Sequence, residues 1–269
     1  MNITYSEGIL AAFHHVMTKY DEVFVIGQGL WSPWYVGTSM TDLDKSYGKE
    51  RVIDCPVSEQ CTTGLGVGAA ISGLRPIVVH PRMDFMILAT DQIVNQAAKW
   101  NHMLGGGNHV PLTIRGIINR GGEQGAQHSQ ALHAWFAHIP GLRVVMPATP
   151  KDARDLLVAS VLCDDPVLYI DDRWLYEVED EVPEIEEVEL GTLRPAVLRA
   201  GSDVSLVGCG YTTNLCLQAA EVLSEKGVSA EVLDLRVLNP LHTDGIVDSV
   251  AKTGHLCVVD GGWQTCGMG

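Results

Sequence analysis

Polar residues that could do acid–base or binding chemistry stand directly after several short apolar runs. These groups are Gly27-Gln28-Gly29, Asp54 to Gln60, His80 to Phe85, and the Gly-rich stretch from Gly121 to Gly125 that leads to Gln127-His128-Ser129-Gln130. If the apolar runs are parallel strands, ligands bind beyond their carboxyl ends, where these groups would lie. Glu59 and His128 carry the side chains that most often move protons. Position alone does not assign them a role, because a Glu after a strand is usually a helix cap or a surface charge.

Several common sites are excluded by the motifs that the sequence lacks. No strand is followed by G-x-G-x-x-G, and no G-x-x-x-x-G-K-[ST] or G-x-S-x-G occurs. Cys209 stands between Gly208 and Gly210, as a nucleophile on a tight turn would. No histidine partner for it is evident in the sequence, so we expect this cysteine to be structural.

The elements that must position these residues alternate between strand and helix. Strands are predicted over 23–26, 52–54, 76–80, 111–116, 142–146, 167–170, 204–208, 230–235 and 255–260. Helices are predicted over 6–19 with Ser6 as the cap, 64–73, 85–99, from Thr149-Pro150 onward, 213–226 and 241–252. Because the strands are continuously apolar, the pattern predicts an α/β fold with a parallel sheet covered on both faces.

An acidic, proline-containing segment interrupts this alternation and suggests two domains. We expect a first domain over 1–176, a linker over 177–192 and a second domain over 193–269. The last residues, Gly261 to Gly269, resemble a strand-to-helix loop without its helix. The second domain is therefore expected to be incomplete.

Composition limits the classes of partner. The chain has 269 residues, of which 46 % are hydrophobic, so it can bury a core. Its 18 Lys and Arg against 33 Asp and Glu give a formal net charge of −15, which disfavours nucleic acids and anionic membranes. No membrane-spanning run and no basic leader are visible. The seven cysteines show no metal-binding spacing, so we expect buried, reduced thiols in a cytoplasmic protein.

An ordered set of motifs resembles one family along nearly the whole chain. The motifs are Asp54-x-Pro56-x-x-Glu59, Gly64 to Pro76, Asp84-Phe85, Asp91 to Lys99, His128-Ser129-Gln130, Phe136 to Leu142, Asp164 to Leu168 and Asp234 to Leu241. Together they resemble the beta subunit of thiamine-diphosphate-dependent 2-oxo-acid dehydrogenases of the pyruvate, branched-chain and acetoin type. Transketolase is a more distant relative with the same domain plan.

The resemblance implies a parallel-sheet, pyrimidine-binding domain followed by an incomplete transketolase C-terminal-type α/β domain. Glu59 would hydrogen-bond N1′ of the cofactor's aminopyrimidine and favour the tautomer that removes the thiazolium C2 proton. Phe85 would stack on the pyrimidine, and Gln28 would contact the cofactor. His128 would face the reacting carbonyl, a position suited to a side chain that ionises near neutral pH.

The chain departs from the family pattern at places that bear on the substrate. Gln28 stands where the family commonly has Glu, and Pro81-Arg82-Met83-Asp84 replaces a stretch that usually reads Gln-Phe-Ala-Asp. Two interpretations of Arg82 stay open: it binds an acidic or phosphorylated substrate, or it pairs with a surface acid. Trp31 and Trp34 follow the first strand, where walls of the substrate site are expected. We expect His133 and His138 to be structural.

The half of the site that would bind the diphosphate is missing from this sequence. In the family, a Gly-Asp-Gly motif holds magnesium and the diphosphate, and no such motif occurs here. The resemblance therefore implies a separate alpha subunit that carries the magnesium site, in an α2β2 heterotetramer. It also implies a potassium ion held by backbone carbonyls at Leu112, Ser160, Val161, Cys163 and Asp165.

Three functions stay open at this point. The first is the beta subunit of an oxidoreductase that decarboxylates a 2-oxo acid and transfers the acyl unit, and that is inactive without its partner. The second is a split, transketolase-like subunit that moves a ketol unit between sugars. The third is a degenerate subunit that serves as a scaffold without catalysis. Because Glu59 and His128 are retained, the two catalytic functions are favoured over the scaffold.

Overall fold

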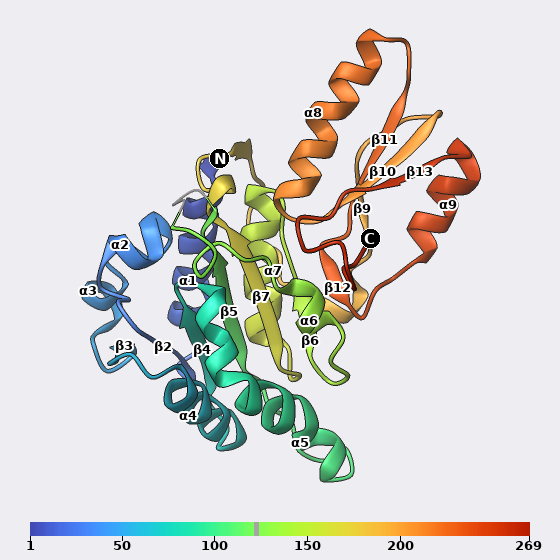
Figure 1. Cartoon of the computed structure of the whole chain (residues 1–269). Helices are drawn as coiled ribbons and strands as arrows, with labels where there is room; N and C mark the ends of the chain where they lie inside the picture. Colours follow the sequence, from blue (N-terminus) through green and yellow to red (C-terminus); the bar gives the residue numbers. More distant parts are fainter. Residues whose placement is uncertain (121–123) are drawn as a thin grey trace.

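The computed structural model describes residues 1–120 and 124–269, and it contains two main sheets (Figure 1). Gly121, Gly122 and Glu123, part of the expected Gly-rich loop, lie outside the described residues. The larger sheet runs in the order β12-β6-β7-β5-β4-β2-β3, and the smaller one in the order β13-β10-β11-β9. A short pair, β1 with β8, is separate from both. None of the described helices is long and apolar enough to cross a bilayer.

The larger sheet is parallel except at one edge, where β12 pairs antiparallel with β6. Its strands are β2 (Val23–Gly27), β3 (Val52–Asp54), β4 (Arg75–His80), β5 (Thr113–Ile118), β6 (Arg143–Val145), β7 (Val167–Asp172) and β12 (Val237–Asn239). In the smaller sheet only β9 is antiparallel to its neighbour. The remaining strands are β1 (Asn2–Thr4), β8 (Glu179–Glu181), β9 (Ala196–Arg199), β10 (Val204–Gly208), β11 (Ala230–Asp234) and β13 (Leu256–Val258).

Helices connect most of these strands. The α-helices are α1 (Tyr5–Lys19), α2 (Pro33–Val36), α3 (Leu43–Tyr47), α4 (Glu59–Ile71), α5 (Ala98–Met103), α6 (His133–Ala137), α7 (Pro150–Leu162), α8 (Tyr211–Glu225) and α9 (Asp244–Thr253). Shorter turns of 3-10 helix are η1 (Gly37–Met40), η2 (Met83–Ala89), η5 (Arg173–Leu175) and η6 (Leu190–Thr192), and η3 (Gln92–Ala97) is a π-helix.

Helices cover both faces of the larger sheet, as predicted. Alternate residues of β4 enter different cores: Ile77 and Val79 belong to one, and Val78 belongs to the other. The first core contains the apolar faces of α1 and α7, and the second contains those of α4, η2 and η3. Because both faces are buried, the central strands carry apolar residues at consecutive positions, as at Ile77 to Val79 in β4 and Val167 to Ile170 in β7.

Two local predictions are wrong. Thr4, not Ser6, caps α1: its side chain accepts a hydrogen bond from the backbone of Glu7, whose carboxylate accepts one from Thr4 N in return. The single helix predicted over 85–99 is instead η2 followed by η3, and α5 begins only at Ala98. With this winding, the apolar side chain of Leu88 is 62 % exposed. Apolar spacing over three turns does not distinguish α from 3-10 and π winding.

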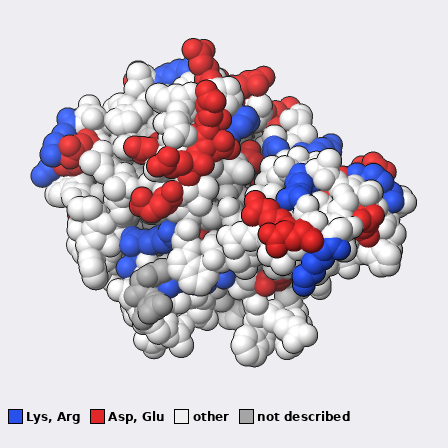
Figure 2. Space-filling model, turned by 90° about the horizontal axis from the view of Figure 1, so that it is seen from above, with Lys and Arg blue, Asp and Glu red and all other residues white. Residues whose placement is uncertain are grey.

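The acidic segment is packed along the first sheet's helices. Its strand β8 pairs with β1, and Arg154 in α7 donates to the carbonyl oxygens of Pro183 and Glu184. Glu187 accepts hydrogen bonds from Lys19 and His15 of α1. Seen from above, acidic side chains form a red band across part of the surface (Figure 2). The proposed boundaries at 176 and 193 stay predictions, because β12 from the second part completes the first sheet.

A buried ion pair joins the centre of the sheet to the loop above it. Arg115 in β5 and Asp171 in β7 are fully buried, and two nitrogens of the guanidinium each lie 2.8 Å from a carboxylate oxygen. Ser39 Oγ and Tyr176 Oη also accept hydrogen bonds from Arg115 Nη2, at 2.8 and 3.0 Å. The pair therefore fixes η1 and the segment after β7 to the strands.

Loss of this pair should destabilise the protein far more than loss of an exposed one. We expect Asp171→Asn to lower the free energy of unfolding by about 3–5 kcal/mol, since it leaves an uncompensated guanidinium in the core. Asp164→Asn removes the partly exposed partner of Arg75 and should cost about 0–1 kcal/mol. Urea unfolding of both variants measures the difference, and equal losses would contradict the assignment.

Candidate active site

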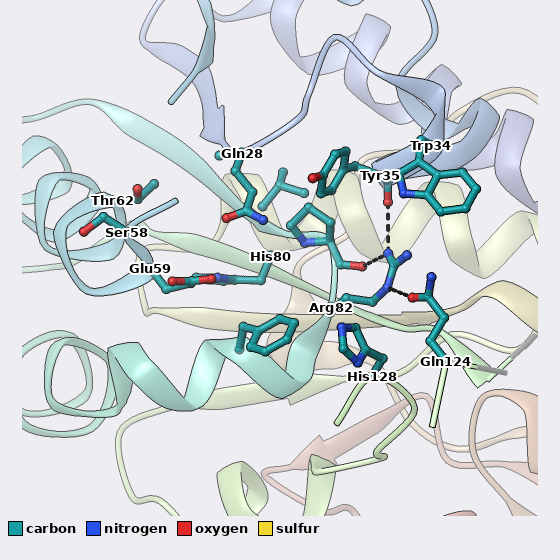
Figure 3. Close-up of a pocket in the computed structure, with 14 residues that line it drawn as sticks. Gln28, Trp34, Tyr35, Ser58, Glu59, Thr62, His80, Arg82, Gln124 and His128 are labelled. Carbon is teal, nitrogen blue, oxygen red and sulfur yellow. Dashed lines mark hydrogen bonds between the residues drawn. The ribbon is translucent and has the colours of Figure 1, made fainter. Parts of the chain in front are cut away.

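A cavity of about 230 Å³ lies at the carboxyl ends of β2 and β4, beside the start of α4 (Figure 3). The polar residues that follow the parallel strands were expected to meet at this end of the sheet. Its lining residues are Gly27, Gln28, Trp34, Tyr35, Ser58, Glu59, Thr62, Val79, His80, Pro81, Arg82, Phe85, Gln124 and His128. Six of the residues predicted from the sequence are therefore brought together: Gln28, Trp34, Glu59, Arg82, Phe85 and His128.

Gln28 is positioned by a tight turn at the end of β2. A Cβ on Gly27 would lie 2.5 Å from the carbonyl oxygen of Val79, so only glycine allows β2 to approach β4 here. Gly29 has a φ of +67° and donates its backbone N–H to Asp54 Oδ1 at 2.6 Å. The turn thus exposes the Gln28 side chain at the pocket.

Glu59 is the first residue of α4, and its side chain is 9 % exposed. Its carboxyl group borders the cavity, and no hydrogen bond joins it to any of the residues drawn in Figure 3. A carboxyl group left without a protein donor in a confined cavity is suited to a donor on a bound ligand.

Phe85 and His128 form one wall of the cavity. The two rings meet edge to face, with centroids 5.1 Å apart and planes at 83°. Phe85 comes from η2, and His128 follows residue 124 in the loop after β5. His128 Nδ1 is buried and has no hydrogen-bond partner among the described residues. The pair therefore offers an aromatic face beside an imidazole whose ring nitrogen is unused.

His80, at the end of β4, is a pocket residue for which sequence reasoning proposed no role. It is almost fully buried, and its Nε2 lies 3.1 Å from Thr63 Oγ1. Burial lowers the pKa of this imidazole to about 4, so the ring is neutral near pH 7. The sequence feature that could have identified His80 as a site residue is its place at the last position of a predicted strand.

Trp31 lies outside this cavity. Its indole Nε1 donates to the carbonyl oxygen of Val52 at 3.0 Å, and Lys49 Nζ lies 4.0 Å from the ring centre. Trp34 and Tyr35, from the same loop, line the cavity instead. The loop therefore provides aromatic walls, but from α2 rather than from Trp31.

The carbonyl groups predicted to hold potassium are near the end of α7. There the Arg75 guanidinium already donates to the carbonyl oxygens of Val161 and Cys163, at 3.0 and 3.2 Å. It also pairs with Asp164. A positive charge is thus already present at two of the predicted ligands.

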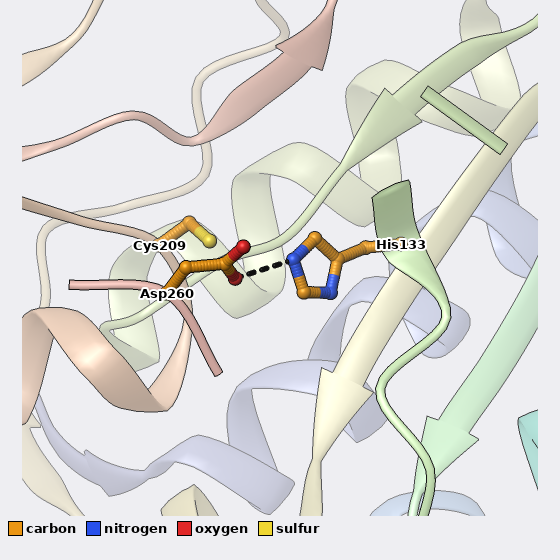
Figure 4. A group of neighbouring side chains, drawn as sticks. All are labelled: His133, Cys209 and Asp260. Atoms are coloured by element: carbon orange, nitrogen blue, oxygen red, sulfur yellow. Dashed lines mark hydrogen bonds and ion pairs between the residues drawn. The ribbon is translucent and has the colours of Figure 1, made fainter. Parts of the chain in front are cut away.

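A second cluster of chemically capable residues lies between the two sheets (Figure 4). His133 Nε2 lies 2.8 Å from Asp260 Oδ1, and the Cys209 thiol is within 4.8 Å of both groups. The expectation that Cys209 has no histidine nearby is therefore wrong, because the sequence cannot show that α6 approaches the end of β10.

The contacts of this cluster give it a structural role. Asp260 also accepts backbone hydrogen bonds from Gly262 and Met268, so its carboxylate holds the C-terminal turn against α6. Although burial raises the pKa of Asp260, the hydrogen bond from His133 and those from the backbone hold it below its ordinary value. Burial raises the pKa of the Cys209 thiol well above its usual range, which makes this cysteine a poor nucleophile.

All seven cysteines are free, but the prediction that they are buried holds only in part. Cys209 and Cys216 are buried, whereas Cys61, Cys257 and Cys266 are exposed. Apolar neighbours in the sequence did not distinguish strands of the core from those at the surface.

His80 should make folding stability depend on pH. Its pKa is about 4 in the folded protein against an ordinary 6.5, so this stabilisation is complete above pH 6.5 and is lost as the pH falls toward 4. The expected loss is about 3 kcal/mol. Urea unfolding at several pH values should show a smaller loss for His80→Gln. His109→Gln, at an exposed histidine, should keep the wild-type profile, and an unchanged profile in His80→Gln would refute the assignment.

Comparison with known proteins agrees with the fold and with the motifs. Residues 1–178 match the transketolase pyrimidine-binding domain, and residues 195–269 match the transketolase C-terminal domain. A solved structure titled "Split gene transketolase, inactive beta4 tetramer" has a TM-score of 0.80 and 23 % identity. It covers 99 % of this chain and 82 % of that chain, and at this identity it supports the fold alone.

Curated relatives identify the family more specifically. The chain is 38 % identical over 270 residues to the pyruvate dehydrogenase E1 component subunit beta of Rickettsia felis, covering all of this chain and 82 % of the relative. It is 42 % identical over 272 residues to the acetoin:2,6-dichlorophenolindophenol oxidoreductase subunit beta of Cupriavidus necator, covering 96 % of this chain and 78 % of that one. The resemblance found in the motifs is confirmed: the chain belongs to the family of these dehydrogenase beta subunits, built from transketolase pyrimidine-binding and C-terminal domains.

Proposed function

We propose that this chain is the beta subunit of a thiamine-diphosphate-dependent enzyme that decarboxylates a 2-oxo acid and transfers the acyl unit. The observation that carries the proposal is the Glu59 carboxyl group, which borders a cavity next to the aromatic ring of Phe85. The names of the curated relatives favour this function over a split transketolase, whose likeness rests on fold alone.

The cavity fits the aminopyrimidine half of the cofactor. Glu59 offers a carboxyl group to a ring nitrogen, Phe85 offers a flat apolar face, and Gln28 offers an amide at the rim. When bound, thiamine diphosphate supplies a thiazolium carbon that attacks the substrate's carbonyl carbon. Glu59 would hold a proton at the pyrimidine N1′, and the neutral His80 would form part of the wall without adding charge.

His128 is proposed to handle a proton at the reacting carbonyl. Its ring is fixed against Phe85, and its Nδ1 has no acceptor or donor among the described residues. An imidazole ionises near neutral pH, so a positioned ring can both give and take a proton during turnover. This assignment keeps Glu59 and His128 in separate roles at one cavity.

A separate alpha subunit would complete the site. This chain has no Gly-Asp-Gly motif to hold magnesium and a diphosphate. We therefore propose that an alpha subunit provides that half in an α2β2 heterotetramer, and that the beta chain alone is inactive.

Potassium is not favoured by the contacts at its predicted ligands. The oxygens of Val161 and Cys163 accept from Arg75, so a potassium ion would have to share or displace that guanidinium. The predicted potassium site at Leu112, Ser160, Val161, Cys163 and Asp165 therefore stays a prediction, and no step is assigned to it.

Glu59→Gln should abolish proton exchange at the thiazolium C2 in the assembled enzyme. The amide cannot share a proton with N1′ as a carboxyl group does, so we expect the exchange rate to fall by about 10²-fold or more. Deuterium exchange followed by NMR measures it, with assembly checked by gel filtration. Glu225→Gln, at the exposed end of α8, is the matched control and should behave as wild type. Exchange that survives in Glu59→Gln would remove Glu59 from this role.

Reconstitution tests the function and the partner together. We expect the beta chain to form a stable heteromer with an alpha subunit that carries Gly-Asp-Gly, and to release carbon dioxide from a 2-oxo acid only in that complex. Ketol transfer between sugar phosphates without carbon dioxide would support the split transketolase instead. A complex with neither activity would support the scaffold.

A further inference from the structure

Two arginines lie together at one end of the cavity. Arg82 is 8 % exposed, and its Nε donates to Gln124 Oε1 at 3.0 Å. Its Nη1 donates to the carbonyl oxygens of Pro81 and Tyr35, at 2.7 and 3.4 Å (Figure 3). Arg173, in η5, donates to the same Tyr35 oxygen. One neutral carbonyl group therefore bridges two guanidinium groups.

None of the acids nearby pairs with these cations in the described structure. Asp171 pairs with Arg115, and Asp172 pairs with Arg120. Asp84 Oδ1 accepts both the backbone and the side-chain N–H of Gln130, and its buried Oδ2 has no partner among the described residues. Within residues 1–120 and 124–269, no carboxylate lies within 4.0 Å of Arg82 or Arg173.

Positive charge is therefore concentrated here without a counter-ion in the described structure. Burial, and then the Arg173 guanidinium, lower the pKa of Arg82, and Tyr176 and Asp84 offset this only in part. Arg173 Nε is also buried without a hydrogen-bond partner among the described residues. Carbonyl dipoles satisfy some donors but do not cancel two charges, so the arrangement is costly unless an anion completes it.

The arginines are placed to meet the far end of a substrate. Figure 3 shows Glu59 and Arg82 on different sides of the cavity, with His128 near Arg82. A guanidinium group is planar and presents paired donors that match a carboxylate or a phosphate group. Arg82 is also the one Lys or Arg among the described lining residues.

We propose that Arg82, supported by Arg173, binds a second anionic group of the substrate, so that the enzyme selects 2-oxo acids with an anionic distal end. This inference rests on the proposed function. Arg82 would touch the substrate directly, and Arg173 would be a positioning residue that acts through the shared carbonyl group of Tyr35.

The test compares matched substrates on the reconstituted heteromer. Carbon dioxide release is measured with 2-oxoglutarate against 2-oxopentanoate, and with 2-oxoadipate against 2-oxohexanoate. We expect kcat/KM to favour the dianionic member of each pair by about 10-fold or more, because charge-assisted hydrogen bonds are made only to the distal anion. 3-Phosphonopyruvate distinguishes a phosphonate from a carboxylate as the preferred group.

Variants assign the preference to the arginines. Arg82→Gln should lower the ratio of dianion to monoanion kcat/KM by about 10- to 100-fold, mainly through KM, and Arg82→Lys should restore part of it because the charge is retained. Arg173→Gln should lower the ratio by less. Arg194→Gln, at an exposed arginine, should keep the wild-type ratio.

The failure of this inference is distinguishable from failure of the proposed function. Turnover of 2-oxo acids with no dianion preference, or a preference that survives Arg82→Gln, overturns the inference alone. Weakened heteromer assembly in Arg82→Gln, with the wild-type ratio kept by the fraction that does assemble, would show that Arg82 pairs with an acid of the alpha subunit, and overturns it too. If no 2-oxo acid is decarboxylated, the proposed function is wrong, and calorimetric binding of glutarate against pentanoate to wild type and Arg82→Gln decides the inference.

Discussion

Burial of both faces of the larger sheet is the constraint on which the site depends. With α1 and α7 on one face and α4, η2 and η3 on the other, polar side chains on the central strands have almost no place except at the strand ends. Asp54, His80 and Asp172 are the last residues of β3, β4 and β7. Arg115 and Asp171 are the exception, and they are tolerated because each neutralises the other.

The same constraint separates charge within the cavity. His80 is kept neutral by burial, while the Glu59 carboxyl group and the Arg82 guanidinium lie on different sides of the cavity. The two acids at the end of β7 pair with Arg115 and Arg120 and not with Arg82. The ion pairs that stabilise the sheet therefore also determine which cations remain available at its edge.

Sequence patterns predicted the features that depend on neighbouring residues or on a family motif. They failed where contacts between segments far apart in the sequence determine the structure. The strands, the parallel sheet and the cap of α7 by Thr149 follow from apolar runs and capping residues. Gln28, Glu59, Phe85 and His128 were found through family motifs and do line one cavity. Trp31 and Trp34 could not be distinguished, because the path of the loop after β2 determines which indole faces the cavity, and that path is not visible in the sequence. The approach of His133 to Asp260 depends on a contact between residues 127 positions apart, which no local pattern records.

The pairing of β12 with β6 has a consequence for how the chain folds during synthesis. β6 spans Arg143–Val145, but its outer neighbour is formed by Val237–Asn239, so its edge stays open until the ribosome has made roughly ninety further residues. Open strand edges are templates for pairing with other chains. The nascent chain thus carries an aggregation-prone edge through translation of the acidic segment, whose like charges repel neighbouring copies over that interval.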